Sequence, residues 1–342
     1  MKFDFIIGNP PYQDETVGEQ KTFAPPIYHH FMDAAYQLAD KVELIHPARF
    51  LSNIGSTPKA WNKKMMADPH FKILFHEQNS ASIFPGMDIR GGGVCCTFRD
   101  ATRTFGAIEA YTKHDQLNQI KIKVSSKEIS GSLSDIIFTQ CRFNLDKLYS
   151  DYPGLRSVIG SDGKEKRFRN NSFDKIPIFT EEQGDNDIKV LGISRNKRIY
   201  RYINKKYVDN RHENLFLWKV LVPSANGSGA LGAVLSTPLI GTPLIGYTQS
   251  FIGIGAFKTE YEALAALKYV KSKFSRAMLG ILKVTQHNDR EVWRLVPLQD
   301  FTPASDIDWS QSIPDIDRQL YAKYGLDADE FEFIETKVKA ME

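Results

Sequence analysis

The first hundred residues alternate between short apolar runs and segments with helical periodicity. Residues 3–8 form an apolar run broken only by Asp4, and the run stops at Asn9-Pro10-Pro11, as a buried strand would. Similar runs predict strands at 42–46, 71–75 and 94–98, and helical spacing predicts helices at 27–39 and 59–66. Strands that alternate with helices indicate an α/β layered domain. The apolar positions of the first helix are Ile27, Phe31, Ala34, Ala35 and Leu38.

The alternation fades after Asp100, and the chain then mixes short strand-like runs with turns up to about Pro297. Thr259-x-x-Glu262 has the spacing of a capping box and predicts one helix over 259–282. The tail predicts a helix near 316–324 that ends at Gly325, and a last helix over 327–341. The second half therefore has a different, mixed organisation.

Composition narrows the class of protein without identifying its partners. The 342 residues suffice for about two domains of roughly 150 residues. A net charge of +3 is too small to indicate nucleic-acid binding, so any basic surface must be local. Cys95, Cys96 and Cys141 lack zinc or redox spacing, so we predict no metal site and a reducing, cytoplasmic setting. No signal peptide and no 18-residue apolar run is present, so we expect no membrane segment.

The segment Asn9-Pro10-Pro11-Tyr12 places two carbonyl oxygens beside an aromatic ring. Asn9 offers its side-chain carbonyl, and Pro10 offers a backbone carbonyl in a loop that its fixed φ helps to hold. Two such acceptors can accept hydrogen bonds from both N–H groups of an exocyclic amine, such as adenine N6, and thereby direct its lone pair toward a methyl donor. Tyr12 supplies a flat face for a base that has left its duplex. Asn-Pro-Pro can also simply end a strand, but the strand before it and Tyr12 after it favour a functional site.

The run Phe3-Asp-Phe-Ile-Ile-Gly-Asn-Pro-Pro-Tyr12 resembles the fourth characteristic motif of gamma-class adenine-N6 DNA methyltransferases. Residues 42–50, Val-Glu-Leu-Ile-His-Pro-Ala-Arg-Phe, resemble the next core strand of that family and its proline-containing loop. Residues 83–92, Ile-Phe-Pro-Gly-Met-Asp-Ile-Arg-Gly-Gly, resemble the later motif whose aromatic residue packs on the other face of the flipped adenine. The resemblance implies that Asn9, Pro10 and Tyr12 are catalytic and that Phe84 stacks on the base opposite Tyr12.

The resemblance extends over nearly the whole chain. Residues 219–229 and 248–286 look like the specificity region of type II restriction–modification methylases, and 306–342 look like their usual ending. It implies methyl transfer from S-adenosylmethionine to adenine N6 in a specific sequence of double-stranded DNA. The implied fold class is α/β, with a partial Rossmann-like methyltransferase sheet followed by a mixed α+β target-recognition domain and a helical tail.

We expect this fold to be divided into three parts. Residues 1–105 would form the target-base half of the catalytic domain, 106–300 the target-recognition (specificity) domain, and 301–342 the helical tail. Neither the DNA sequence that is recognised nor a fused endonuclease follows from these residues, because base readout depends on side chains aimed by the fold.

The cofactor-binding residues of this chain are not assigned. In the family the S-adenosylmethionine site precedes the Asn-Pro-Pro-Tyr motif, and only eight residues precede Asn9 here. Gly227-Ser-Gly-Ala-Leu-Gly232 fits G-x-G-x-x-G, but residues 233–246 contain two prolines and no helical period, which favours a DNA-facing loop. We expect the cofactor half to come from an upstream domain or a separate methylase subunit, and weak or no cofactor binding by the isolated chain.

Basic residues concentrate in two segments of the second half, one at 164–169 and one at 195–206. Tyr200, Tyr202 and Tyr207 are interleaved with the second. A charge run often forms only solvated surface, but interleaved aromatic rings and local positive charge suit a phosphate backbone. The second segment is the predicted DNA-binding set: Arg195, Lys197, Arg198, Arg201, Lys205 and Lys206.

Three functions are compatible with these motifs. The leading one is an adenine methylase of a restriction–modification system that depends on an additional cofactor half. The second is a catalytically inactive DNA-specificity subunit or a truncated remnant. The third is methylation of protein glutamine or RNA guanine, whose enzymes share Asn-Pro-Pro-Tyr. The roughly 200 residues after Asp100 argue against the third, because a compact protein methylase has no use for them.

Overall fold

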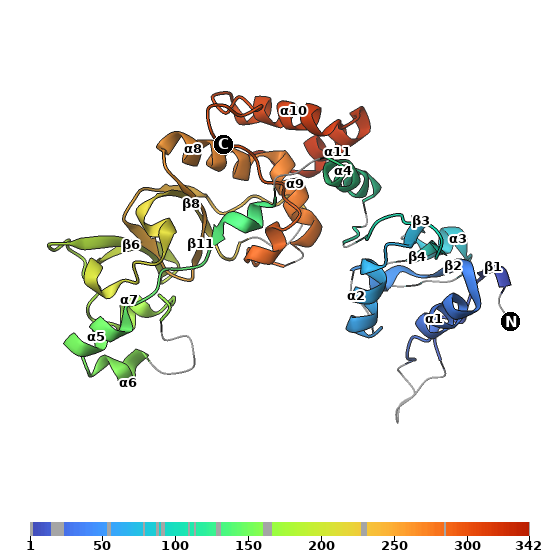
Figure 1. Ribbon diagram of the computed structural model, residues 1–342, viewed down its shortest axis with the longest axis horizontal. Coiled ribbons are helices and arrows are strands. Elements are labelled where there is room, and N and C mark those ends of the chain that lie inside the picture. Colours follow the sequence, from blue (N-terminus) through green and yellow to red (C-terminus); the bar gives the residue numbers. More distant parts are fainter. Residues whose placement is uncertain are drawn as a thin grey trace. The chain divides into compact units, whose positions relative to one another are not determined.

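The computed structural model describes residues 3–14, 24–52, 56–77, 79–86, 89, 93–108, 110–112, 114–127, 131–159, 166–226, 231–283 and 285–341. The chain divides into two compact units, residues 1–118 and 119–342 (Figure 1). Both units combine sheets and helices, which confirms the mixed α/β class, while the Rossmann-like arrangement stays a prediction. No helix in the described ranges has the length and apolar character needed to cross a membrane.

The first unit is built on a four-stranded sheet with the order β1-β2-β4-β3. Strands β1 and β2 are parallel, whereas β4 is antiparallel to both of its neighbours. Every strand predicted from an apolar run in this unit is present. The strands are β1 (Phe3–Gly8), β2 (Ala39–Pro47), β3 (Phe71–Glu77) and β4 (Val94–Asp100).

Helices α1 (Tyr28–Leu38) and α2 (Lys59–Ala67) pack on this sheet around one core, which confirms both predicted helices. The apolar stripe predicted for α1 is wrong at most positions, however, since only Ala35 of the five is buried. The helix buries Tyr28, His29, Met32 and Ala35, while Phe31, Ala34 and Leu38 are exposed. The sheet-facing stripe contains Tyr28 and His29, whose rings lie edge-on to Trp61, and a count of aliphatic positions overlooks such residues.

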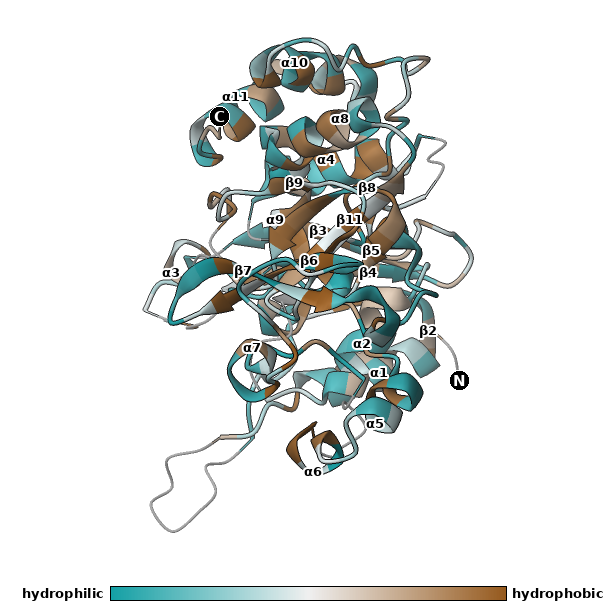
Figure 2. Ribbon diagram, turned by 90° about the vertical axis from the view of Figure 1, so that its left-hand side faces the viewer, coloured by the Kyte–Doolittle hydropathy of each residue, from teal (hydrophilic) through white to brown (hydrophobic). Residues whose placement is uncertain are grey.

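The second unit contains a three-stranded sheet, β10-β6-β7, and a four-stranded sheet, β5-β11-β8-β9. Figure 2 shows the apolar character of β8 and β11, whose residues are largely buried. Except for the parallel pair β6 and β10, the strands pair antiparallel. The strands are β5 (Ile137–Phe138), β6 (Asp187–Ser194), β7 (Lys197–Asn204), β8 (Trp218–Pro223), β9 (Leu239–Gly241), β10 (Ile245–Tyr247) and β11 (Phe251–Phe257).

The capping box at Thr259 is present, but the single helix predicted over 259–282 is wrong. The chain breaks at Ser272, whose ψ of 150° is extended and whose hydroxyl accepts a hydrogen bond from the backbone N–H of Ser275. A serine in a helical pattern can start a new helix in this way, and apolar periodicity alone does not reveal it. Two helices result, α8 (Glu260–Lys271) and α9 (Lys273–Leu282).

The remaining helices surround these sheets and join the tail to them. Helix α10 (Ile313–Tyr324) ends at Gly325, which has a φ of +66°, as the sequence predicts. Helix α11 (Ala328–Lys337) is shorter than the predicted 327–341. The others are α3 (Ser80–Ile83), α4 (Asp115–Ser125), α5 (Leu145–Asp151), α6 (Leu155–Ile159) and α7 (Ser172–Lys175).

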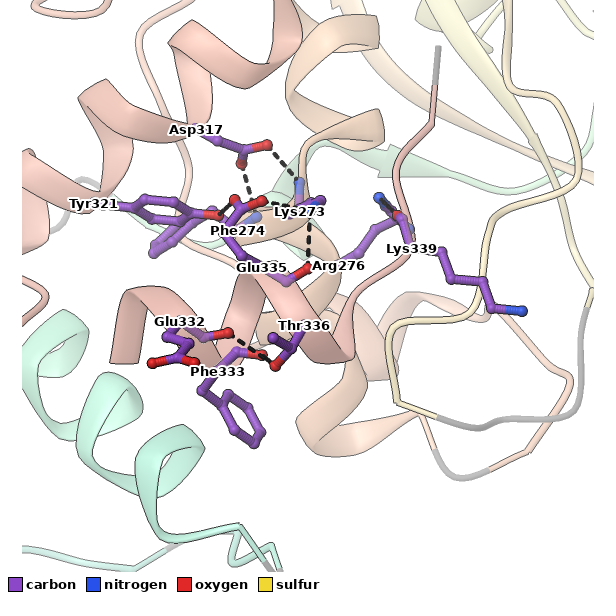
Figure 3. Close-up of polar contacts among 10 residues, drawn as sticks. All are labelled: Lys273, Phe274, Arg276, Asp317, Tyr321, Glu332, Phe333, Glu335, Thr336 and Lys339. Atoms are coloured by element: carbon purple, nitrogen blue, oxygen red, sulfur yellow. Dashed lines mark hydrogen bonds and ion pairs between the residues drawn. The ribbon is translucent and has the colours of Figure 1, made fainter. Parts of the chain in front are cut away.

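A buried carboxylate connects α10 to the beginning of α9 (Figure 3). Asp317 accepts hydrogen bonds from the backbone N–H groups of Lys273, at 3.0 Å, and Phe274, at 2.9 Å. It thus satisfies two donors that a helix N-terminus leaves free. Burial nevertheless raises the pKa of Asp317 to about 6, because the two hydrogen bonds offset only part of the desolvation. The tail therefore belongs to the second unit.

The raised pKa of Asp317 should make the free energy of unfolding depend on pH. Because the folded pKa lies above the ordinary value of 3.8, protonation favours the fold, and the contribution is lost as the pH rises through about 6. In Asp317→Asn, which keeps an acceptor oxygen but cannot titrate, we expect this loss to disappear. Urea unfolding of both proteins between pH 4.5 and 7.5 should show a difference that changes by ~2 kcal/mol. Two parallel stability curves would contradict the assignment.

Candidate functional site

The Asn9-Pro10-Pro11-Tyr12 segment begins where β1 ends, at the carboxyl end of the parallel pair β1 and β2. The chain after it is fastened to the segment that leads into α1. The carbonyl of Tyr12 accepts from the backbone N–H of Ile27 at 3.2 Å, and Asp14 donates to the carbonyl of Pro25 at 2.9 Å. Asn9 is exposed, and Pro10 and Tyr12 are half-buried. The loop is thus anchored on both sides while Asn9 stays accessible, as a base-binding loop requires.

Tyr12 is half-buried and encloses its hydroxyl group. The hydroxyl oxygen is buried and makes no hydrogen bond of ordinary geometry in the described part of the chain. Burial raises the pKa of Tyr12, the nearby Asn9 side chain lowers it in part, and Cys95 raises it further. Tyr12 is therefore neutral at pH 7, and its hydroxyl group interacts with the Asn9 side chain.

A second group of uncharged rings lies at the end of β2, in the motif at 42–50, although the sequence analysis assigned no role to its histidine. His46 is fully buried and stacks on Tyr28 with ring centroids 5.5 Å apart and an interplanar angle of 8°. Its Nε2 lies 2.8 Å from the Thr97 hydroxyl, and its Nδ1 lies 3.7 Å from Cys95 Sγ. Burial lowers the pKa of His46 to about 4, so the ring is neutral at pH 7.

Cys95 connects the two groups of rings. Its Sγ lies 3.7 Å from His46 Nδ1, and after burial, which is the main cause, it also raises the pKa values of Tyr12 and Tyr28. The site therefore has an uncharged aromatic wall. The signal in the sequence was a histidine directly before the proline that ends a predicted strand.

Phe84 stands directly after α3 and is half-buried. Ser80 fastens this turn, because its carbonyl accepts from the Phe84 N–H and its hydroxyl accepts from the Ile89 N–H, both at 2.8 Å. In the described ranges no ring contact joins Phe84 to Tyr12. Asp88, Arg90 and Gly91-Gly92 of the same motif lie outside the described residues. The pairing of Phe84 with Tyr12 around a base stays a prediction.

The strand that leads to this site forms one edge of its sheet. In the described part of the chain β1 pairs only with β2, yet its apolar side chains are exposed: Phe3 by 50%, Phe5 by 45% and Ile7 by 73%. Only Ile6 contributes to the core beneath α1. On α1, Phe31 and Leu38 are also exposed. Phe3, Phe5 and Ile7 share the face of the sheet opposite Ile6, and an unpaired strand edge beside such an exposed apolar face marks a surface for association.

The glycine-rich segment does not form a cofactor loop in the part that is described. Gly227 to Ala230 lie outside the described residues, and Gly232 packs against the tail of the same chain. A Cβ at Gly232 would lie 2.3 Å from the carbonyl oxygen of Lys337, and its φ is +71°. Its own carbonyl accepts from the backbone N–H of Lys339 at 3.2 Å and from Arg276 at 3.4 Å. No helix begins within the described residues 231–246, so Gly232 does not stand at a helix N-terminus as a nucleotide-binding glycine loop requires.

The predicted DNA-binding residues surround the β6–β7 hairpin, whose turn contains Arg195 and Asn196 at φ values of 48° and 61°. Four of the six are engaged within the protein. Arg198 donates to the carbonyls of Ser236 and Thr237, Arg201 pairs with Glu181, Lys206 pairs with Asp151, and Lys205 lies over the Phe216 ring.

Two cations of this set remain at the tip of the hairpin. Arg195 and Lys197 are exposed and have no ion pair with another described side chain. Strand alternation also places Arg198 on the face of β7 opposite Lys197 and Arg201. The six residues therefore do not present one cationic face, and their role in DNA binding stays a prediction.

The described residues contain no group of three histidine, cysteine or carboxylate side chains that could hold a metal ion. Cys95, Cys96 and Cys141 are buried free thiols. Cys95 and Cys96 stand in β4, as expected for strand positions that pack in the interior.

The anchored loop and the open strand edge fall in the segment that matches a known protein family. Residues 1–84 match the model of the Eco57I restriction-modification methylase family. The match supports a restriction-modification methyltransferase, and it includes Asn9, Tyr12 and Phe84. It covers about a quarter of the chain. No curated protein matches the chain.

Solved restriction-modification enzymes are distant from this chain. The type IIL enzyme MmeI in complex with DNA is 8% identical, covers 98% of this chain and has a TM-score of 0.32. The type IIG restriction endonuclease BpuSI is 11% identical, also covers 98%, and has a TM-score of 0.35. The chain spans 56% and 53% of these proteins. Such scores are too low to establish a shared fold.

Proposed function

We propose that the chain contributes the target-base half and the specificity region of an adenine-N6 DNA methyltransferase in a restriction–modification system. The observation that carries this proposal is the position of Asn9-Pro10-Pro11-Tyr12. The loop follows a strand at the carboxyl end of a parallel pair, leaves Asn9 accessible and falls within the residues that match the methylase family. Type IIL and type ISP restriction-modification enzymes described in complex with DNA are among the distant solved structures.

In this proposal the loop positions the amine of a flipped adenine. The side-chain carbonyl of Asn9 and the backbone carbonyl of Pro10 accept hydrogen bonds from its two N–H groups. The nitrogen lone pair, otherwise delocalised into the ring, is then directed away from the base plane and toward the methyl donor. Tyr12 stacks on one face of the base and Phe84 on the other. Its enclosed hydroxyl and the neutral rings of His46 and Tyr28 add no charge that would compete for the amine.

The methyl donor, S-adenosylmethionine, would be held by a cofactor half that the described residues do not supply. We propose that this half, in a longer chain or in a separate subunit, adds a strand to the free edge of β1. The exposed side chains of Phe3 and Ile7 support this surface, because they lie on the strand that leads directly to Asn9. Pairing there would place a bound cofactor beside the base-binding loop.

Replacing exposed apolar residues of β1 should weaken association with the cofactor half without destabilising the fold. In Phe3→Ser/Ile7→Ser we expect the affinity for a candidate cofactor-half protein to fall roughly ten- to a hundredfold, because buried apolar area stabilises such an interface. Calorimetry would measure the affinity, and a methylation assay on mixed DNA with both proteins would measure activity.

The matched control is Leu264→Ser/Phe331→Ser, which removes two similarly exposed apolar side chains from the second unit. Equal affinities for the two variants would refute docking at β1. Failure of every candidate partner to produce methylation would instead favour a DNA-specificity subunit without catalytic activity.

A further inference from the structure

A small pocket opens in the second unit between α6 and α7, outside the predicted DNA-binding hairpin. One side is apolar and includes Val158 and Ile159 from α6, an element that Figure 2 shows to be largely hydrophobic. The other side carries three cations, Arg167, Arg169 and Lys175. Asn171 and Ser172 also line the pocket, and none of its described lining residues is an aspartate or a glutamate. A pocket of this composition suits a singly charged anion attached to an apolar group.

The backbone holds the two arginines on the same side of an extended segment. Phe143 donates to the carbonyl of Lys166 at 2.6 Å, and Phe168 donates to the carbonyl of Cys141 at 3.0 Å, so residues 166–168 pair with 141–143. Phe168 is fully buried and packs on Phe143, with the two ring centroids 4.4 Å apart. Because side chains alternate along an extended chain, an inward Phe168 directs its neighbours Arg167 and Arg169 outward together.

The turn that follows is equally well fixed and brings in the third cation. The hydroxyl of buried Ser172 accepts from the backbone N–H of Arg169 at 2.8 Å, and the side chain of Asn170 accepts from Ser250 at 2.7 Å. Lys175 stands at the end of α7, where its N–H donates to the carbonyl of Asn171 at 3.1 Å. The backbone positions of the cations are therefore set before any ligand arrives.

Two of the three cations of this pocket differ from those of the hairpin in one respect. Arg167 and Lys175 are exposed and form no ion pair with a described side chain, whereas Arg198, Arg201 and Lys206 bind carbonyls or carboxylates of the protein. Cations that are already paired have little left to offer an external phosphate, while unpaired cations on a rigid segment offer most.

We propose that the pocket binds one phosphodiester group of the DNA backbone, with Arg167, Arg169 and Lys175 around the phosphate and Val158 beside the sugar. This inference rests on the proposed function, because it names the contact by which the specificity region holds duplex DNA. It assigns the stronger phosphate contact to residues 167–175 and not to the hairpin. A phosphate contact fixes the register of the protein on the duplex without reading its sequence.

The test compares two variants with the same change in charge. Arg167→Gln/Lys175→Gln removes two cations from the pocket. Arg211→Gln/Arg318→Gln removes two exposed arginines that are ion-paired within the protein, to Asp209 and Asp315. Binding of the full chain to mixed duplex DNA would be measured by fluorescence anisotropy between 50 and 250 mM salt. Inorganic phosphate would be titrated calorimetrically at matched ionic strength.

For the pocket variant we expect roughly tenfold weaker DNA binding at low salt, and a slope of log K against log salt that is smaller by about 1. The control should behave as the unmodified protein, and thermal unfolding of both variants should be unchanged, since the substituted side chains are exposed.

The remaining outcomes separate the possible failures. If both variants bind DNA alike, the pocket is not a phosphate contact, although the proposed function stands. If the pocket alone determines binding of inorganic phosphate while DNA binding is unaffected, the ligand is a free phosphate and the DNA assignment is overturned. If the unmodified protein shows no salt-dependent duplex binding, the proposed function fails together with this inference.

Discussion

Replacing Asn9 by alanine is expected to lower methylation by the reconstituted enzyme by roughly 10³-fold and to leave duplex binding within twofold of the original value. The reason is that Asn9 offers the only side-chain carbonyl of the Asn-Pro-Pro-Tyr segment, so its loss leaves one N–H group of the adenine amine without its acceptor. Losses of roughly 10²–10³-fold follow when a single preorganised group is removed from a reacting centre. Because Asn9 is exposed and follows the end of β1, its truncation should not disturb the fold.

The assay needs a control that loses the same side chain elsewhere in the first unit. Asn79→Ala is suitable, because Asn79 is exposed and its side chain makes no capping hydrogen bond to α3. Initial rates of methyl incorporation and DNA affinity would be measured for both variants with the cofactor half present. Equal rates for Asn9→Ala and Asn79→Ala would refute the base-binding role. Loss of both DNA binding and unfolding cooperativity in Asn9→Ala alone would identify a structural role.

The first unit was largely predictable from sequence because its elements are specified by local patterns. Buried strands are continuous apolar runs between turn residues, and all four in this unit fall where such runs occur. The burial of α1 was not predictable in the same way. Tyr28 and His29 are amphipathic, and whether they face the sheet depends on Trp61, which is distant in the sequence. The open edge of β1 also could not be predicted, since an apolar strand looks the same whether or not a partner covers it.

The basic residues show a similar limit in the second unit. The sequence analysis identified residues 195–206 because six basic residues lie close together in this segment. It could not show that Arg201 and Lys206 are paired with Glu181 and Asp151, which are 20 and 55 residues away. Lys175 was overlooked because it stands apart from the Arg167 cluster and joins it only through the turn at Ser172. Charge density in sequence therefore predicts a basic surface less well than the number of cations that the fold leaves unpaired.

Lys219 is the residue whose environment departs furthest from what its type suggests. It is fully buried in β8, and its ammonium donates to the carbonyls of Asn214, Leu215, Leu217 and Thr242 at 2.7–3.3 Å. Gly241 leaves room for it, since a Cβ there would lie 2.9 Å from the lysine Cγ. Burial lowers the pKa of Lys219 to about 8, so the group is still charged at pH 7. Its ammonium joins two backbone segments, residues 214–217 and Thr242, by donating to four of their carbonyls.

Lys219→Met, which fills a similar volume without a donor, is therefore expected to lower the free energy of unfolding by about 3–5 kcal/mol. The carbonyls of Leu215 and Thr242 also accept backbone N–H groups, so the loss falls mainly on those of Asn214 and Leu217. Lys197→Met, at an exposed position of β7, is the matched control and should change stability by less than about 0.5 kcal/mol. Urea unfolding at pH 7 would measure both. A neutral or stabilising Lys219→Met would mean that desolvation of the ammonium outweighs its four hydrogen bonds, and that the lysine is retained for a reason other than stability.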